Sequence, residues 1–153
     1  MIQINTNTII YQPIKQVFDF VSTPENDFQW QYGTLASSRL SKKSNAIGSF
    51  FRSIGHLMGR RNLSTFEVTE YEPGRRYGFK SLSGPLNSHT IFTFEMNQGS
   101  TRVSISVQAQ VHGINSEVIS EVTLEKKMKN QIKENLRLLK ELLEENTASS
   151  LVL

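Results

Sequence analysis

Residues 118–143 read VISEVTLEKKMKNQIKENLRLLKELL, and the expected architecture of the chain follows from this stretch. Apolar residues recur through it at helical spacing, with lysines mostly between them: Val118, Val122, Met128, Ile132, Leu136, Leu139 and Leu143. This pattern predicts a helix with one apolar stripe. At about 1.5 Å per residue, a helix from Glu117 to Glu145 is roughly 40 Å long. Such a helix needs an equally long apolar surface, which only a sheet formed by the preceding segments provides.

The segments before this helix alternate as β-strands do. Residues 101–111 have the clearest period of two, because one face carries Val103, Ile105, Val107, Ala109 and Val111 while the other is polar. Such alternation indicates a sheet with one buried and one solvated face, which is typical of antiparallel strands. We expect strands over residues 2–10, 34–40, 48–57, 63–71, 76–82, 86–96 and 101–111.

Two short helices are expected after the first strand. Pro13 suits a first helical turn, and apolar residues follow it at the spacing of one helix face, from Ile14 to Val21. Pro24 similarly opens a second, very short helix that reaches Gln29 and Trp30. The predicted class is therefore α+β: an antiparallel sheet of about seven strands, two short helices and a long C-terminal helix.

Length and composition fit a single globular domain. The chain has 153 residues, of which 37% are hydrophobic and 20% charged. We place the domain at residues 1–145 and expect residues 146–153 to form a C-terminal tail. The formal net charge of +3 is small, and basic pairs such as Lys42-Lys43 and Arg60-Arg61 are scattered. We therefore expect no nucleic-acid partner.

The residue types also exclude several kinds of site. The chain has no cysteine, which rules out a disulfide framework, a thiolate metal site and a cysteine nucleophile. The N-terminal residues do not resemble a signal peptide, and no apolar run approaches the roughly 20 residues of a membrane span. We expect a cytoplasmic protein without stable membrane insertion.

Four stretches together resemble the helix-grip fold of the START and Bet v 1-like (SRPBCC) superfamily. They are similar in detail to its polyketide cyclase/dehydrase-like branch, and their order and spacing cover nearly the whole chain. The stretches are PIKQVFDFV at 13–21 with PEN at 24–26 and Trp30; GSFF at 48–51 with GRR at 59–61; FEVTEYEPGRR at 66–76 with SGP at 83–85; and GSTRV at 99–103 with LKELLE at 139–144.

The resemblance implies a curved sheet wrapped around the long helix, with an elongated cavity between them. Members of the superfamily use this cavity for lipids, sterols, polyketides, quinones or plant hormones, and some perform chemistry in it. The fold alone does not select among these functions.

Candidate ligand-binding residues come mainly from the inward faces of the strands. The alternation places apolar and aromatic side chains there with a few hydroxyl groups, while Phe51 and Ser53 are added from the resembling motif. Apolar walls with sparse polar groups are typical of ligand sites, although a filled core has the same composition. The candidates are Trp30, Phe51, Ser53, Phe66, Tyr77, Phe79, Ser81, Thr90, Phe92, Val107, Met128 and Ile132.

No catalytic or metal-binding set is evident. The three histidines, His56, His89 and His112, are isolated in the sequence, so we assign no metal site and no cofactor. Glu67 and Glu95 are expected to face away from the core, and the chain has no Gly-x-Ser-x-Gly elbow.

The function predicted from these features is binding of a small, largely apolar molecule, which is lipid-like, polyketide-like or aromatic, between the sheet and the C-terminal helix. One alternative is a polyketide cyclase/dehydrase-type enzyme, with Tyr77 or a histidine as acid or base. Another is a protein-interaction module with a filled core. The chain is expected to be a monomer or a homodimer.

Trp30, the only tryptophan, leaves two interpretations open. It is either a buried structural wedge or part of a gate that contacts the ligand, because an indole offers a large apolar face and one N–H donor.

Overall fold

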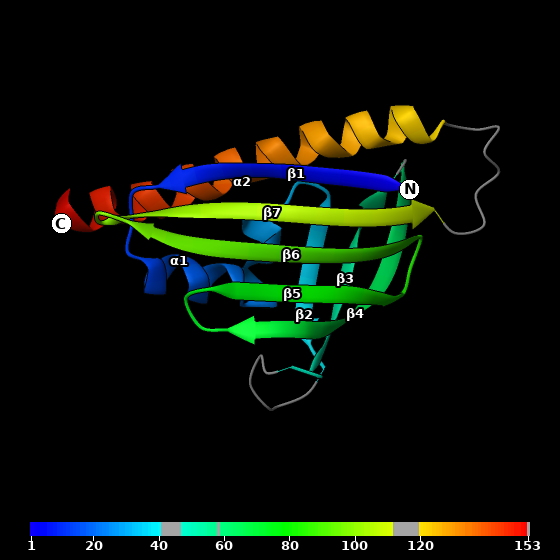
Figure 1. Ribbon diagram of the computed structural model, residues 1–153, viewed down its shortest axis with the longest axis horizontal. Helices are drawn as coiled ribbons and strands as arrows, with labels where there is room; N and C mark the ends of the chain where they lie inside the picture. Colours follow the sequence, from blue (N-terminus) through cyan, green and yellow to red (C-terminus); the bar gives the residue numbers. More distant parts are fainter. Residues whose placement is uncertain (41–46, 58, 112–119, 153) are drawn as a thin grey trace.

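The fold is one seven-stranded antiparallel sheet whose concave face holds the long C-terminal helix (Figure 1). The computed structural model describes residues 1–40, 47–57, 59–111 and 120–152. The strand order is β1-β7-β6-β5-β4-β3-β2. The elements are β1 (Ile2–Ile10), α1 (Ile14–Val21), the 3₁₀ helix η1 (Pro24–Gln29), β2 (Thr34–Arg39), β3 (Phe50–Leu57), β4 (Arg60–Glu72), β5 (Arg76–Ser83), β6 (Leu86–Asn97), β7 (Ser100–Val111) and α2 (Glu121–Val152). The predicted α+β helix-grip architecture is confirmed.

The hairpin between β3 and β4 is tighter than predicted. The strands were expected to end at residue 57 and to resume at residue 63, but pairing continues through His56↔Arg61 to Leu57↔Arg60. Gly59, with φ of +75°, supplies a left-handed conformation that glycine adopts readily. The strands therefore extend close to the hairpin tip, and they carry His56 and Leu57 to the rim of the sheet.

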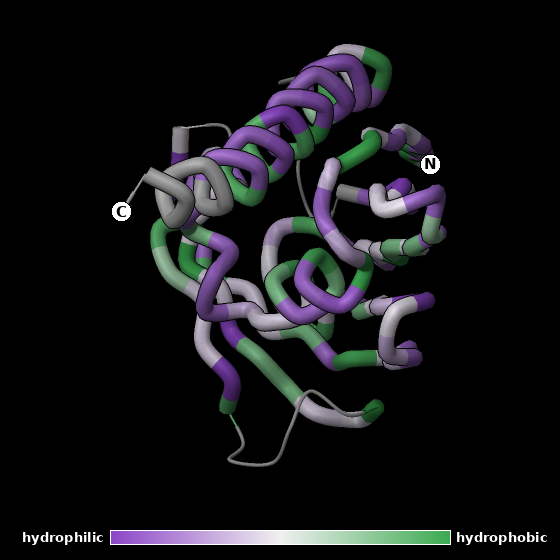
Figure 2. Tube along the Cα trace, turned by 90° about the vertical axis from the view of Figure 1, so that its left-hand side faces the viewer, coloured by the Kyte–Doolittle hydropathy of each residue, from purple (hydrophilic) through white to green (hydrophobic). Residues whose placement is uncertain are grey.

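Irregular pairing accompanies the curvature of the sheet. The register between β4 and β5 shifts between Thr65 and Phe66 and again between Val68 and Glu70, and the register between β2 and β3 shifts near Thr34. Such bulges bend a strand and increase its local twist. Figure 2 shows the resulting curve of the sheet below α2, whose hydrophobic stretches face it.

The long helix begins at a capping serine. The backbone N–H of Thr123 donates to Ser120 Oγ at 3.1 Å, so α2 begins at Glu121. The predicted start at Glu117 and the stripe residue Val118 lie outside the described residues. At the other end the helix continues to Val152, so the expected tail is largely helical backbone.

The prediction for one residue of the apolar stripe is wrong. Val122 is 77% exposed, and Leu124 is buried in its place. The stripe then continues through Met128, Ile132 and Leu136, since these positions share one face at intervals of four residues. Leu124 and Met128 thus place the N-terminal half of α2 over the sheet.

Side chains of α2 also bond the free edge of β1. Glu125 accepts the backbone N–H of Gln3 at 2.9 Å, and Glu144 accepts that of Tyr11 at 3.1 Å. Lys140 Nζ donates to the carbonyl of Ile9 at 2.7 Å. These bonds satisfy backbone groups that an edge strand leaves unpaired, and they fix the helix along β1.

The space between the sheet and α2 is packed with side chains at one end and less so at the other. At the C-terminal half of α2, the short helix α1 lies against β6 and β7 and fills the space. Val17, Phe18, Val103, Leu139 and Leu143 are fully buried there, and the rings of Phe18 and Phe94 meet edge to face with 5.1 Å between centroids. We call this region, defined by those five buried residues, the packed end.

Candidate functional site

A cavity of about 210 Å³ lies between the sheet and the N-terminal half of α2. The helix contributes Met128 and Ile132, which are only partly buried against the core. We call this region the hollow end. It is lined by Trp30, Gln31, Phe66, Phe79, Leu86, Ser88, Thr90, Phe92, Ile105, Val107, Met128, Ile132, Asn135 and Leu136.

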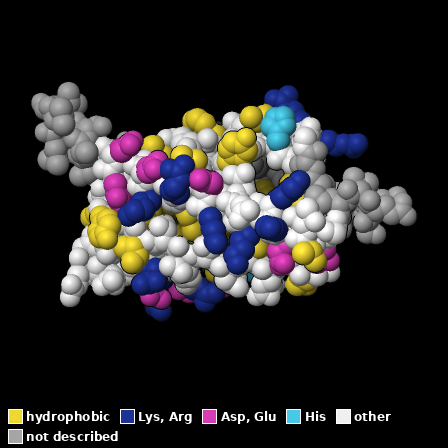
Figure 3. Space-filling model, turned by 90° about the horizontal axis from the view of Figure 1, so that it is seen from above, with side chains coloured by type: hydrophobic (Ala, Val, Ile, Leu, Met, Phe, Trp, Pro, Cys, Tyr) yellow, Lys and Arg dark blue, Asp and Glu magenta, His cyan; other side chains and the backbone are white. Residues whose placement is uncertain are grey.

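Two further hollows adjoin this cavity at the rim. One, of about 300 Å³, shares Met128 with the cavity and is bordered by Tyr32, His56 and Lys127. The other, of about 170 Å³, shares Phe66, Leu86 and Ser88 with it. Figure 3 looks onto the α2 side and shows acidic and basic side chains mixed along it, with a hollow beside a histidine. The shared wall residues place both hollows directly beside the cavity.

Most of the predicted ligand-binding residues meet at this place. The central cavity is lined by Trp30, Phe66, Phe79, Thr90, Phe92, Val107, Met128 and Ile132. Ser53 lies in the 170 Å³ hollow at the rim. Ser81 is not part of the central lining: its hydroxyl accepts the backbone N–H of Ser88 at 2.8 Å, close to where the pairing of β5 and β6 stops.

Phe51 and Tyr77 support the wall from behind. Phe51 stacks on Phe66 with centroids 5.1 Å apart and meets Phe79 edge to face at 5.2 Å. Tyr77 stacks on Phe92 at 6.3 Å. Such ring contacts are favourable beyond the burial of their area. The aromatic side of the cavity is therefore a fixed wall.

The rim is held to both the sheet and the helix. A Cβ atom on Gly55 would lie 2.6 Å from the carbonyl oxygen of Gly33, so these two glycines permit a close backbone approach. The backbone N–H of His56 donates to that same oxygen at 2.7 Å. On the other side, Asn135 Oδ1 accepts the backbone N–H of Tyr32 at 2.9 Å. The segment after η1 thus bridges β3 and α2 over the cavity.

Trp30 combines features of both earlier interpretations. It is 2% exposed, as a wedge would be, and it also lines the cavity. Its ring meets Phe92 edge to face with centroids 6.1 Å apart. The indole Nε1 is buried, and no described residue accepts its hydrogen bond. A buried tryptophan N–H usually forms a hydrogen bond, so this donor is available to an acceptor inside the cavity.

Asp27 is a buried acid that the sequence-based analysis missed. It is 7% exposed, and burial followed by the charge of Glu25 raises the pKa of its carboxyl well above the ordinary value. Burial also raises the pKa of the Tyr77 hydroxyl well above its usual range, with Asp27 as the next cause. Asp27 and Trp30 are three residues apart, and that spacing stacks side chains on one side of a 3₁₀ helix. This three-residue spacing was the feature of the sequence from which the position of Asp27 beside Trp30 could have been predicted.

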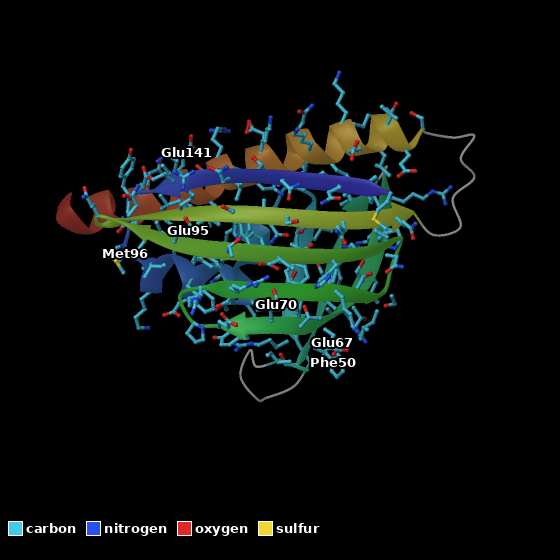
Figure 4. All side chains as sticks on the ribbon, viewed as in Figure 1. Phe50, Glu67, Glu70, Glu95, Met96 and Glu141 are labelled. Carbon is cyan, nitrogen blue, oxygen red and sulfur yellow. The ribbon has the colours of Figure 1, made fainter. Side chains whose placement is uncertain are left out.

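The other titratable candidates lie away from the cavity interior. His89 is within 3.2 Å of the Thr69 hydroxyl, His56 is exposed at the rim, and His112 lies outside the described residues. Figure 4 shows Glu67, Glu70 and Glu95 on the side of the sheet opposite α2. Within the described ranges, no three histidine, aspartate or glutamate side chains cluster as metal ligands would. Nor does any described helix combine the length and apolarity needed to cross a membrane.

Comparisons with known proteins agree with this architecture. The family model described as "Polyketide cyclase / dehydrase and lipid transport" matches residues 1–144. A protein from Thermus thermophilus is similar in structure, with a TM-score of 0.77 and 16% identity over 91% of this chain and 94% of that one. A START superfamily protein from Mycobacterium smegmatis has a TM-score of 0.75 and 13% identity over 94% and 99%.

A third similar structure is the di-domain ARO/CYC protein BexL of the BE-7585A biosynthetic pathway. Its TM-score is 0.72 and its identity 14%, and the match covers 94% of this chain and 47% of BexL. The search of curated proteins found no match. At these identities the similar structures establish the fold alone.

Proposed function

This chain belongs to the polyketide cyclase/dehydrase and lipid transport family, and on that premise we propose that it binds a small, largely apolar molecule at the hollow end. One observation carries the proposal: Met128 and Ile132 face the aromatic wall across a space of about 210 Å³. The same helical stripe is fully buried at Leu139 and Leu143. At the packed end, α1 covers the apolar side chains of the sheet and of α2. A bound apolar molecule would cover the corresponding side chains at the hollow end.

The size and chemistry of the space support this proposal. An engineered cavity of about 150 Å³ holds benzene, so the present cavity suits a molecule of one or two rings. Its walls are mostly apolar, with Gln31, Ser88, Thr90 and Asn135 as sparse polar groups. Longer molecules would extend into the hollows at the rim. A carrier, sensor or storage role fits a site of this kind, whereas an interaction module was expected to have a filled core.

An enzyme of the polyketide cyclase/dehydrase type is the second candidate, and the pair Asp27 and Tyr77 favours it. Both groups have a raised pKa and are buried next to the aromatic wall. Burial favours the neutral form of both groups, and a neutral carboxyl or phenol can donate a hydrogen bond to a substrate oxygen. The similarity to BexL, an ARO/CYC protein, is compatible with this alternative. Turnover of a polyketide-like ketone that Asp27→Ala abolishes would support it.

The binding proposal is tested by filling the cavity. Calorimetric titration with a small neutral bicyclic probe, 1-tetralone, should give saturable heat for the wild-type chain. Ile132→Trp, which places a larger side chain in the cavity wall, should abolish that heat. Val122→Trp is the matched control, because Val122 is exposed on the same helix. No saturable binding to the wild-type chain, or equal binding by Ile132→Trp with an unchanged melting temperature, would contradict the proposal.

A further inference from the structure

The chemistry of the hollow end also narrows the class of ligand. We propose that the bound molecule is uncharged and presents a carbonyl oxygen to the indole N–H of Trp30, with its apolar body against Phe79, Ile105 and Ile132. This inference rests on the binding function proposed above and adds the polar group by which the ligand is oriented.

The first argument is the unpaired donor. Trp30 forms part of the cavity wall, its side chain is 2% exposed, and its Nε1 has no acceptor among the described residues. A buried N–H that forms no hydrogen bond carries the full cost of its removal from water. An acceptor on the bound molecule would remove that cost. Because indole only donates, the matching ligand atom must be an acceptor.

The second argument is the charge of the surroundings. None of the described residues that line the cavity carries a formal charge. The acidic residues of η1, the short helix that leads to Trp30, are Glu25 and Asp27. Glu25 already pairs with Arg39 at 3.1 Å. A ligand carboxylate at Trp30 would therefore be removed from water without a cation in the cavity wall, which is strongly unfavourable.

The buried acid fits the same conclusion. Asp27 and Tyr77 are both buried. Burial raises the pKa of both groups, so each stays neutral as a hydrogen-bond donor over a wider pH range. Asp27 and Tyr77 are not part of the cavity lining, and in their neutral forms they add no charge behind the wall. This environment favours an uncharged acceptor group.

The opposite arrangement would place an anionic head at the rim. Lys127 and His56 border the 300 Å³ hollow that shares Met128 with the cavity, and they could face a carboxylate there. In that arrangement the apolar tail alone would reach Trp30, whose N–H would stay unpaired. The two arrangements therefore predict opposite preferences for ligand charge.

The test uses three probes with one carbon skeleton: tetralin, 1-tetralone and tetralin-1-carboxylate. Their dissociation constants are measured by calorimetry at pH 7.5. We expect 1-tetralone to bind about tenfold more tightly than tetralin, which is the effect of one buried hydrogen bond, and the carboxylate to bind most weakly. Trp30→Phe should remove the preference for the ketone, while Phe28→Leu, altered at an exposed residue of η1, should keep it.

A second readout does not depend on a variant. Trp30 is the only tryptophan, so a ¹H–¹⁵N spectrum contains one indole resonance. Saturation with 1-tetralone should shift this proton downfield by more than saturation with tetralin does, since a hydrogen bond to a carbonyl forms only with the ketone.

Three outcomes would overturn the inference. Equal affinity for tetralin and 1-tetralone, with equal indole shifts, would show that water or nothing bonds the indole, while the proposed binding function would stand. Tightest binding of the carboxylate, weakened by Lys127→Ala, would show an anionic head at the rim. Binding of no probe at all would overturn the proposed function together with the inference.

Discussion

The packed end and the hollow end are built from one helix and one sheet, yet they differ in what covers them. At the packed end, α1 lies against β6 and β7, and Phe18 joins Phe94 and Tyr71 in edge-to-face contacts. At the hollow end, the short helix nearby is η1, whose last turn leads to Trp30, and a space of about 210 Å³ remains. The packed end therefore supplies stability, whereas the hollow end has room for a second molecule.

Truncation at the packed end should have the greatest consequence for stability. Leu139 is fully buried, so Leu139→Ala should lower the free energy of unfolding by about 2–5 kcal/mol. Met128→Ala at the hollow end should cost less, because its side chain already borders empty space. Denaturant titration of both variants measures the difference. Equal losses would show that the two ends are equally well packed.

The rim of the hollow end depends on the close approach of two glycines. In Gly55→Ala the new Cβ would lie 2.6 Å from the carbonyl oxygen of Gly33, so the backbone must shift. We expect a loss of about 1–3 kcal/mol in the free energy of unfolding, together with weaker binding of 1-tetralone. Arg52→Ala, exposed on the same strand, is the control. A Gly55→Ala chain with wild-type stability would mean that the rim does not require this contact.

Asp27, close in sequence to Trp30 of the hollow end, should make the stability of the fold depend on pH. Its folded pKa is raised above the ordinary value of 3.8, so between that value and the raised pKa the folded state binds more protons than the unfolded state. The stabilising contribution is thus fully present below about pH 4 and is lost as pH rises through the folded pKa.

Replacement by a neutral residue of similar shape isolates this effect. Asp27→Asn should raise the free energy of unfolding at pH 8 by about 1 kcal/mol and leave it nearly unchanged at pH 4. Melting curves at the two pH values measure the difference, with Asp19→Asn, an exposed acid, as control. A uniform change at both pH values would mean that the fold does not raise the pKa of Asp27.

The link between the rim and α2 should have the smallest effect on stability. Asn135→Ala removes the acceptor for the Tyr32 backbone N–H, which should cost about 0.5–1.5 kcal/mol. The dissociation rate of 1-tetralone should rise more clearly, since the segment over the cavity loses its bond to the helix. Asn130→Ala, exposed on α2, should change neither quantity. An unchanged dissociation rate for Asn135→Ala would exclude this segment from the ligand's route.

The sequence predicts the elements better than it predicts the site. Strand parity and helical spacing are local signals, so the order of the elements and the inward position of Phe66, Thr90 and Phe92 follow from them. The electrostatic influence of Asp27 on Tyr77 does not, because the two residues are fifty positions apart in the sequence. The volume of the cavity also escapes prediction, since a filled core and a ligand site have the same apolar composition. Val122 was misassigned because it precedes Met128 by six residues, a spacing that turns it away from the face that Leu124 and Met128 share.

The difference between the two ends can be measured directly from methyl resonances during titration with 1-tetralone. Binding at the hollow end should produce saturable shifts at Met128, Ile132, Ile105 and Val107, which line the cavity. The methyl groups of Leu139 and Leu143, fully buried at the packed end, should not move. Saturable shifts confined to the packed end, or none at either end at saturating probe, would contradict the assignment of the hollow end as a binding site.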